Sequence, residues 1–152
     1  MQISGLDGII ETPRLQLRGA TINDASALAA LRAEADIPWK VAQETRAFLI
    51  EGQAGPVGCI GLTPDGRWPE LGLWIAKAHR GQGFATEATL AALEWAERQW
   101  GQKAVAAGHF AADPALGAVF EKAGFLDTGD VELRPSLVRP DPAPARMMVW
   151  LA

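Results

Sequence analysis

Residues 70–100 place three structural signals in direct succession: a β-prone run, a loop with two glycines and a long helical segment. The run Glu70-Leu71-Gly72-Leu73-Trp74-Ile75 is typical of a strand, and it leads into Arg80-Gly81-Gln82-Gly83-Phe84-Ala85. Residues 84–100 contain no glycine or proline, and their apolar side chains recur at helical spacing. The sequence therefore predicts a β-strand that is followed by a glycine-containing turn and then by a long helix.

This junction has the chemistry of an anion-binding site. Gly81 and Gly83 let the backbone adopt conformations closed to other residues, so several N–H groups can converge. The helix adds its positive end, and the Arg80 guanidinium can add a charge-assisted bond to a phosphate. The alternative is that the two glycines merely form a tight turn. Other phosphate loops fit poorly, because the loop lacks a Gly-Lys-Ser/Thr ending and a third glycine.

The remaining segments predict a single α+β domain over residues 1–152. Asp113-Pro114 is typical of an N-cap followed by proline at the first helical position, and Gly124 is suited to close that helix. Alternation and helical periodicity predict strands and helices around one central sheet. The predicted strands are 15–18, 45–51, 57–62, 70–75, 103–110, 126–132 and 147–151, and the predicted helices are 25–35, 84–100 and 114–123.

Composition argues against a nucleic-acid-binding protein, a membrane protein and a metal site. The formal charge of −4 argues against a nucleic-acid surface, which needs clustered Lys and Arg. No run of apolar residues is long enough to span a membrane, and no signal segment is present, so we expect a cytoplasmic protein. The lone Cys59 lies in an apolar run, where a thiol usually acts as a small buried hydrophobe. No Cys or His lies at ligand spacing, and we expect no metal.

Two motifs in this order resemble those of the GNAT superfamily of N-acetyltransferases. The string Trp-Ile-Ala-Lys-Ala-His-Arg-Gly-Gln-Gly-Phe-Ala-Thr-Glu-Ala at residues 74–88 is similar to the acetyl-CoA motif Arg/Gln-x-x-Gly-x-Gly/Ala. The string Asp-Pro-Ala-Leu-Gly-Ala-Val-Phe-Glu-Lys-Ala-Gly-Phe at 113–125 resembles the branch of ribosomal-protein-alanine acetyltransferases, as does Thr-Pro-Arg-Leu-Gln-Leu-Arg at 12–18. The resemblance covers nearly the whole chain.

The resemblance implies a splayed, mostly antiparallel sheet of about six to seven strands flanked by three to four helices. It also implies an enzyme that transfers an acetyl group from acetyl-CoA directly to a primary amine, on a protein N-terminus or a small molecule. The pantetheine arm would lie along the end of the fourth strand, and the pyrophosphate would meet the glycine loop. The residues implied for cofactor binding are Trp74, Ile75, Ala76, Arg80, Gly81, Gln82, Gly83, Phe84, Ala85, Thr86 and Asp113.

The amine must lose a proton, and two residues are candidates for the base. Glu70 resembles the acidic residue that many relatives carry near the start of this strand. His109 lies on the strand before the short helix, near the thioester in the family. The alternatives are a solvated strand-end carboxylate and a structural histidine. His79, in the loop, is expected to be exposed or close to a phosphate.

Three departures from the family pattern keep a second function open. Asp113 replaces the family's Asn, Leu116 replaces its Ser, and the chain contains no tyrosine to protonate the leaving thiolate. A protein that binds acyl-CoA without turnover is therefore the alternative. Trp39 and Trp68 are expected either to pack or to line the acceptor side. A third alternative is a structural domain that associates, for example as a homodimer, through residues on the far side of the long helix: Leu90, Leu93 and Trp100.

Overall fold

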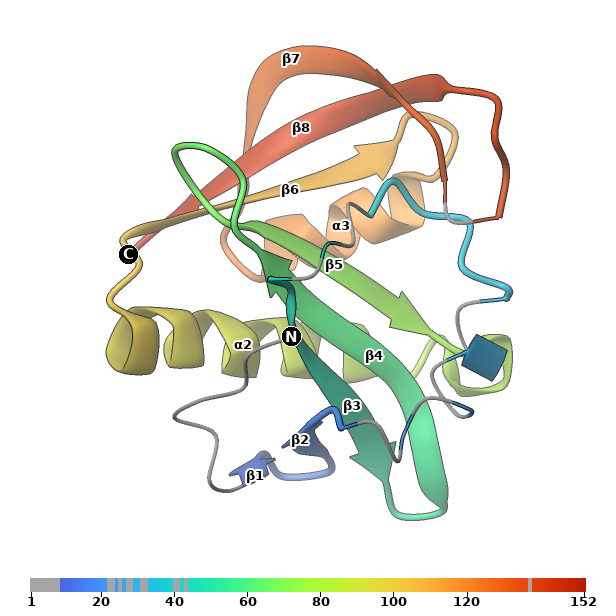
Figure 1. Ribbon diagram of the computed structural model, residues 1–152, viewed down its shortest axis with the longest axis vertical. Helices are drawn as coiled ribbons and strands as arrows, with labels where there is room; N and C mark the ends of the chain where they lie inside the picture. The colour runs from blue at the N-terminus through green and yellow to red at the C-terminus, as the bar shows by residue number, and fades with distance from the viewer. Residues whose placement is uncertain are drawn as a thin grey trace.

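The protein is an eight-stranded sheet with helices, in the strand order β1-β2-β3-β4-β5-β6-β8-β7 (Figure 1). The computed structural model describes residues 9–21, 24, 26, 29–30, 33–39, 42, 44–136 and 138–152. The helix predicted over residues 25–35 falls largely outside these described residues. The elements are β1 (Ile9–Glu11), β2 (Gln16–Gly19), β3 (Arg46–Gly52), β4 (Gly55–Thr63), β5 (Glu70–Ile75), η2 (Lys77–His79), α2 (Phe84–Trp100), β6 (Ala104–Phe110), α3 (Pro114–Lys122), β7 (Leu126–Arg134) and β8 (Ala143–Leu151).

The strand predictions are confirmed, with one strand more than expected. The additional strand is β1, which has three residues and pairs with β2 in antiparallel register. A segment this short carries too little alternation to be recognised in the sequence. The mixed architecture and the mostly antiparallel sheet are as predicted.

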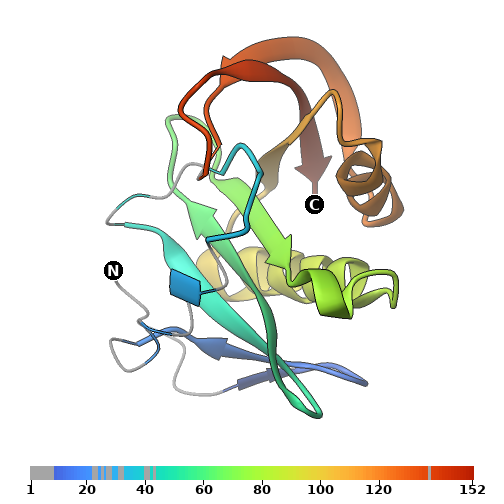
Figure 2. The same cartoon turned by 90° about the vertical axis from the view of Figure 1, so that its right-hand side faces the viewer.

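The sheet divides between β5 and β6. All other neighbouring strands are antiparallel, whereas β5 and β6 are parallel and pair only at Glu70↔Ala106 and Leu71↔Ala107. Beyond these two pairs the strands diverge, and the β6-β8-β7 part arches away from β5 (Figure 2). Among the described residues, no strand pairs with the carboxyl-terminal half of β5 on its β6 side.

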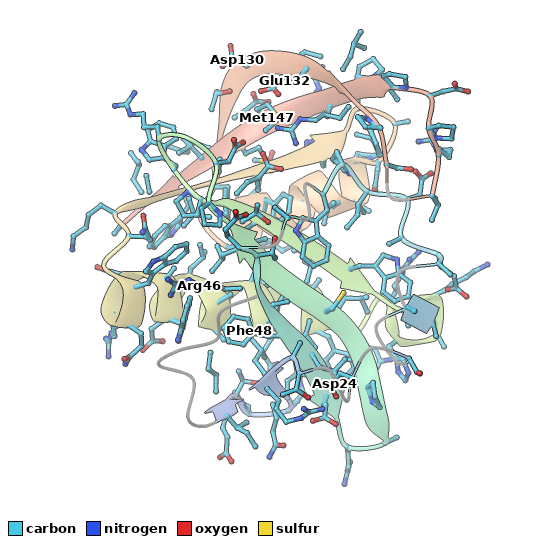
Figure 3. All side chains as sticks on the ribbon, in the orientation of Figure 1. Asp24, Arg46, Phe48, Asp130, Glu132 and Met147 are labelled. Atoms are coloured by element: carbon cyan, nitrogen blue, oxygen red, sulfur yellow. The ribbon has the colours of Figure 1, made fainter. Side chains whose placement is uncertain are left out.

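The main core lies between the sheet and the two helices. Phe48 lies on β3 (Figure 3). Its ring meets that of Trp95 on α2 edge-on, with ring centroids 5.3 Å apart. Leu93 is 2% exposed in this core, and Trp100 packs against it. Leu93 and Trp100 therefore pack inside the molecule, and an association through the far side of the long helix would not rest on these two residues. Leu90 remains half exposed, at 50%.

Both predicted caps of α3 are present. The Asp113 carboxylate accepts a hydrogen bond from the Leu116 N–H at 3.3 Å, and Pro114 occupies the first helical position. Gly124 has a φ of 103°, and the Phe125 N–H donates back to the Phe120 carbonyl at 2.9 Å. The helix therefore begins and ends at fixed points, which sets Leu116 and Gly117 in its first turn against β6.

Candidate active site

The glycine loop forms a backbone cradle between β5 and α2. Gly81 and Gly83 have φ angles of 77° and 82°, in the left-handed region that favours glycine. Within the described part of the chain, the N–H groups of residues 81–86 donate to no protein acceptor. The first turn of α2 adds its positive end to the same place. This is a row of unused donors suited to a diphosphate.

Two arginines flank the cradle, one of which sequence reasoning missed. Arg80 donates its Nε to the Ile75 carbonyl at 2.8 Å, and its guanidinium lies 5.8 Å from the Trp74 ring. Arg14 donates from Nη1 to the Gln82 carbonyl at 2.6 Å. Its guanidinium also lies over the Phe84 ring, 4.7 Å from the centroid. The sequence holds no signal for Arg14, because it reaches the loop from the strand β2 side.

Glu87, in the first turn of α2, fixes Arg14 beside the loop. Its carboxylate accepts from the Arg14 Nε at 2.8 Å and from the Arg14 backbone N–H at 2.9 Å, and also from the Thr12 hydroxyl. Burial raises the pKa of Glu87, but the hydrogen bonds from Thr12 and Arg14 outweigh it, so the pKa lies below its ordinary value. The charged form is therefore the one that the fold holds at neutral pH.

Glu70, the first candidate base, is buried in an ion pair with Arg134 of β7. Its two oxygens accept from Nη1 and Nη2 of Arg134, each at 2.8 Å, and both side chains are at most 6% exposed. The same guanidinium donates to the Pro38 carbonyl at 3.2 Å and to the exposed Glu132 at 3.1 Å. Both carboxylate oxygens are thus already engaged by the Arg134 guanidinium.

His109, the second candidate, has one ring nitrogen engaged. Nδ1 lies 3.0 Å from the Phe110 carbonyl and 3.1 Å from the Asp113 carbonyl. Carbonyl oxygens only accept, so in this arrangement Nδ1 carries the hydrogen and Nε2 keeps its lone pair. Gly117 of α3 makes room for the ring, since a Cβ placed there would lie 2.7 Å from Nε2. In the described part of the chain, Nε2 of His109 thus has no hydrogen-bond partner and lies against Gly117, whereas both oxygens of Glu70 are engaged by Arg134.

A small cavity lies in the gap between β5 and β6. Its volume is about 10 Å³, room for one water-sized group. Residues 37–39, residues 71–73 of β5 and Gly108 of β6 line it, together with Leu116 and Phe120 of α3. Trp39 is buried there, as the packing alternative expected, and it also lines this cavity. Trp68 instead lies under the Arg67 guanidinium, 4.6 Å from the ring centroid.

The splayed sheet, the donor-rich loop and the buried gap between β5 and β6 together define a coenzyme A-dependent acyltransferase. Residues 14–126 match the family described as Acetyltransferase (GNAT) domain, and the chain belongs to that family. Enzymes of this family use acetyl-CoA. A search of curated proteins found none that matches.

Solved structures share this fold across nearly the whole chain. The spermidine N-acetyltransferase from Vibrio cholerae, in complex with CoA and spermine, is 18% identical with a TM-score of 0.74, over 92% of this chain and 96% of that one. RimL, a ribosomal alpha-N-protein acetyltransferase in complex with coenzyme A, is 18% identical with a TM-score of 0.76, over 95% and 98%. A putative ribosomal-protein-serine acetyltransferase from Vibrio cholerae is 17% identical with a TM-score of 0.73, over 97% and 99%.

The described residues contain neither a membrane-spanning helix nor a metal-binding cluster. No helix there is long and apolar enough to cross a membrane. The same residues contain no group of three or more His, Cys, Asp or Glu side chains placed to hold a metal ion. Cys59 is buried in the face of β4 that packs against Trp39 and Trp74.

Proposed function

We propose that the protein transfers an acetyl group from acetyl-CoA to a primary amine, with the pyrophosphate held by the N–H groups of residues 81–86. The observation that carries this proposal is the row of donors without protein acceptors at a helix N-terminus. Arg80 and Arg14 would supply positive charge on either side. Bound acetyl-CoA would contribute an activated thioester acyl group.

The pantetheine arm would follow the free edge of β5. Among the described residues, no strand pairs with residues 72–75 on their β6 side, so an extended ligand could lie along Trp74, Ile75 and Ala76 as an added strand would. The Ala76 N–H already donates to the Val57 carbonyl, and the Ile75 carbonyl already accepts from Arg80. Asp113, at the start of α3, is committed to capping that helix. Its contact with the cofactor, which the resemblance implies, stays a prediction.

We propose His109 as the group that removes the amine proton, and Glu70 as the alternative. The support for His109 is the lone pair on Nε2, fixed by two carbonyls at Nδ1. The support for Glu70 is only its place at the start of β5, because Arg134 occupies both of its oxygens. A neutral imidazole can accept a proton without breaking a buried ion pair.

The test of the cofactor site is calorimetric titration of CoA into Gly83→Val. A side chain at this left-handed position would distort the loop and block backbone approach, so we expect CoA affinity to fall about 10- to 100-fold, the equivalent of one or two charge-assisted bonds. The matched control is Gly129→Val, at a φ of 85° in the β7 bulge, which should keep wild-type affinity. Unchanged affinity in Gly83→Val would reject the pyrophosphate site.

The absence of tyrosine supports one other function, acyl-CoA binding without turnover. Leu116, where relatives carry Ser, lines the cavity with an apolar side chain and adds no proton donor. Thiol release measured with a panel of primary amines separates the two functions. A cytoplasmic location, the lack of nucleic-acid partners and a homodimer stay predictions.

A further inference from the structure

Glu87 is linked to two consecutive carbonyl groups of the glycine loop. Its backbone N–H donates to the Gly83 carbonyl at 3.1 Å, which is the first hydrogen bond of α2. Its carboxylate accepts from the Nε of Arg14 at 2.8 Å, and Nη1 of the same guanidinium donates to the Gln82 carbonyl at 2.6 Å. One residue in the first turn of α2 therefore reaches the loop by two routes, and only the first is an ordinary helical hydrogen bond.

These two carbonyls determine where the neighbouring N–H groups point. In a trans peptide, the C=O of one residue and the N–H of the next lie in one plane and point in opposite directions. Both peptide bonds concerned are trans. Because the Gln82 carbonyl is turned toward Arg14, the Gly83 N–H is turned away from it. The Gly83 carbonyl, which is turned into the helix, orients the Phe84 N–H in the same way. Both N–H groups belong to the row that donates to no acceptor in the described part of the chain.

The glycine backbone does not fix this conformation by itself. Glycine occupies regions of positive and negative φ about equally readily, so a loop with two glycines has several orientations of its N–H groups available. Arg14 is the side chain that lies against the loop here. A Cβ placed on Gly83 would lie 3.1 Å from its Nη2, and its guanidinium lies 4.7 Å from the centroid of the Phe84 ring. The orientation of the loop therefore depends on how Arg14 is held.

Arg14 is held by the carboxylate of Glu87, which is the buried part of this network. The second oxygen of that carboxylate accepts from the Thr12 hydroxyl and, at 2.9 Å, from the Arg14 backbone N–H. The side chain of Glu87 is 16% exposed, whereas that of Arg14 is 47% exposed. The carboxylate thus fixes both the backbone and the guanidinium of Arg14. We call Thr12, Arg14 and Glu87 the loop clamp.

From these contacts we infer that Glu87 is a positioning residue for the cofactor, which acts through Arg14 to hold the peptide between residues 82 and 83 with its N–H toward the diphosphate. The inference rests on the proposed function. Glu87 does not itself bind the ligand, because both of its oxygens are engaged by the loop clamp. A carboxylate beside an anion site repels the ligand, so its benefit lies in the groups that it orients. Preorganised donors bind an anion without a cost of rearrangement.

The test is Glu87→Gln, which keeps one side-chain oxygen as an acceptor and removes the negative charge. Removal of a carboxylate near an anionic ligand should by itself strengthen binding. If Glu87 positions the loop, the sign is opposite, and calorimetric titration should show a CoA affinity about 5- to 10-fold lower, the equivalent of about one hydrogen bond. The KM for acetyl-CoA should rise about as much, while kcat at saturating acetyl-CoA stays within about twofold, because the lost interaction concerns binding rather than the chemical step.

The matched control is Glu94→Gln, the same change about two turns further along α2. Glu94 is exposed and pairs with Arg98 of the same helix, so its CoA affinity should stay at the wild-type level or rise slightly. The inference is overturned if Glu87→Gln binds CoA as tightly as the wild type or more tightly, or if Glu94→Gln shows an equal loss. A lower kcat with an unchanged KM would also overturn it, since that result indicates less folded protein rather than a displaced loop. A wild-type protein that does not bind CoA would instead reject the proposed function, and the inference with it.

A second variant serves if Glu87→Gln does not fold. Arg14→Lys keeps the positive charge at an exposed position, but an ammonium lacks the planar fork that contacts the Glu87 carboxylate and the Gln82 carbonyl together. If the position of the guanidinium matters, CoA affinity falls about 5- to 10-fold in this variant as well. Wild-type affinity in Arg14→Lys would mean that the charge alone is sufficient, and it would equally overturn the inference.

Discussion

At the scale of the residue, the tautomer of His109 decides which ring nitrogen could accept a proton from the amine. Two backbone carbonyls face Nδ1, and the Nε2 edge of the ring fills the space that a Cβ on Gly117 would take. The ring is therefore oriented by groups that cannot move without disturbing the first turn of α3. A side chain held in this way offers one nitrogen to a substrate and keeps the other for the protein.

We expect His109→Gln to lower kcat about 100- to 10,000-fold, the usual range for loss of a general base. The rate of the wild type should fall as the pH is lowered, because a protonated imidazole cannot accept a proton. This decline, the acid limb of the pH–rate profile, should be absent in the variant. The comparison requires pH–rate profiles of both proteins with the same amine. His79→Gln, at the other histidine of the chain, should retain the limb; a limb that survives in His109→Gln would remove the base role.

The glycine loop was predictable from local spacing, because Gly81, Gly83 and the helix that follows are neighbours in the chain. Arg14 and Arg134 were not predictable, since each reaches the site across the sheet. Arg14 lies 73 positions from its partner Glu87, and Arg134 lies 64 positions from Glu70. The environment of Glu70 was missed for the same reason: its partner comes from β7, and no pattern in β5 indicates it.

At the scale of the element, Arg134 connects three segments that meet at the gap in the sheet. Its guanidinium joins the start of β5, the end of β7 and the residue before Trp39. β7 is otherwise exposed along most of its length, and Glu132 lies on its outer part (Figure 3). The buried ion pair thus anchors a strand that has little core of its own.

Glu70→Gln should lower the free energy of unfolding by about 3–5 kcal/mol, because it leaves the buried Arg134 charge without its main partner. Denaturant titration measures this. Glu132→Gln removes the exposed partner of the same guanidinium and should cost less than about 1 kcal/mol. If Glu70→Gln kept wild-type stability and lost the acid limb instead, Glu70 rather than His109 would be the base.

Strand and helix bounds follow from alternation and caps, and most were predictable to within a few residues. The divergence of β5 from β6 was not, because it depends on how far two distant strands pair. The resemblance to the GNAT family predicted a splayed sheet, and the register of β5 and β6 shows where the two strands diverge. Likewise, the sequence left the packing of Leu93 open, because helical periodicity does not show how many elements cover a helix, and α2 is covered by β4, β5 and α3.

At the scale of the whole molecule, two carboxylates hold the amino-terminal segment: Asp24 pairs within that segment, and Glu87 ties it to α2. Asp24 accepts from Nη1 and Nη2 of Arg18 on β2 at 3.0 and 2.8 Å, and Glu87 holds Arg14. Hydrogen bonds from the Arg18 side chain, then from the Thr21 backbone, lower the pKa of Asp24 from 3.8 to about 2. The pKa of Glu87 is lowered as well.

These shifts give the stability a definite pH dependence. A carboxylate whose pKa is lower in the folded state stabilises the fold fully above its unfolded pKa, and this stability is lost as the pH falls toward the folded value. The contribution of Asp24 should therefore be complete above about pH 5 and disappear between about pH 4 and pH 2. Unfolding free energies of the wild type and Asp24→Asn, measured across that range, should converge at the acid end. Asp141→Asn, at an exposed position, should follow the wild type throughout.

The contradicting result is a difference in unfolding free energy between the wild type and Asp24→Asn that stays constant from pH 7 to pH 2. It would mean that the stability contributed by the Asp24–Arg18 pair does not depend on the charge of Asp24.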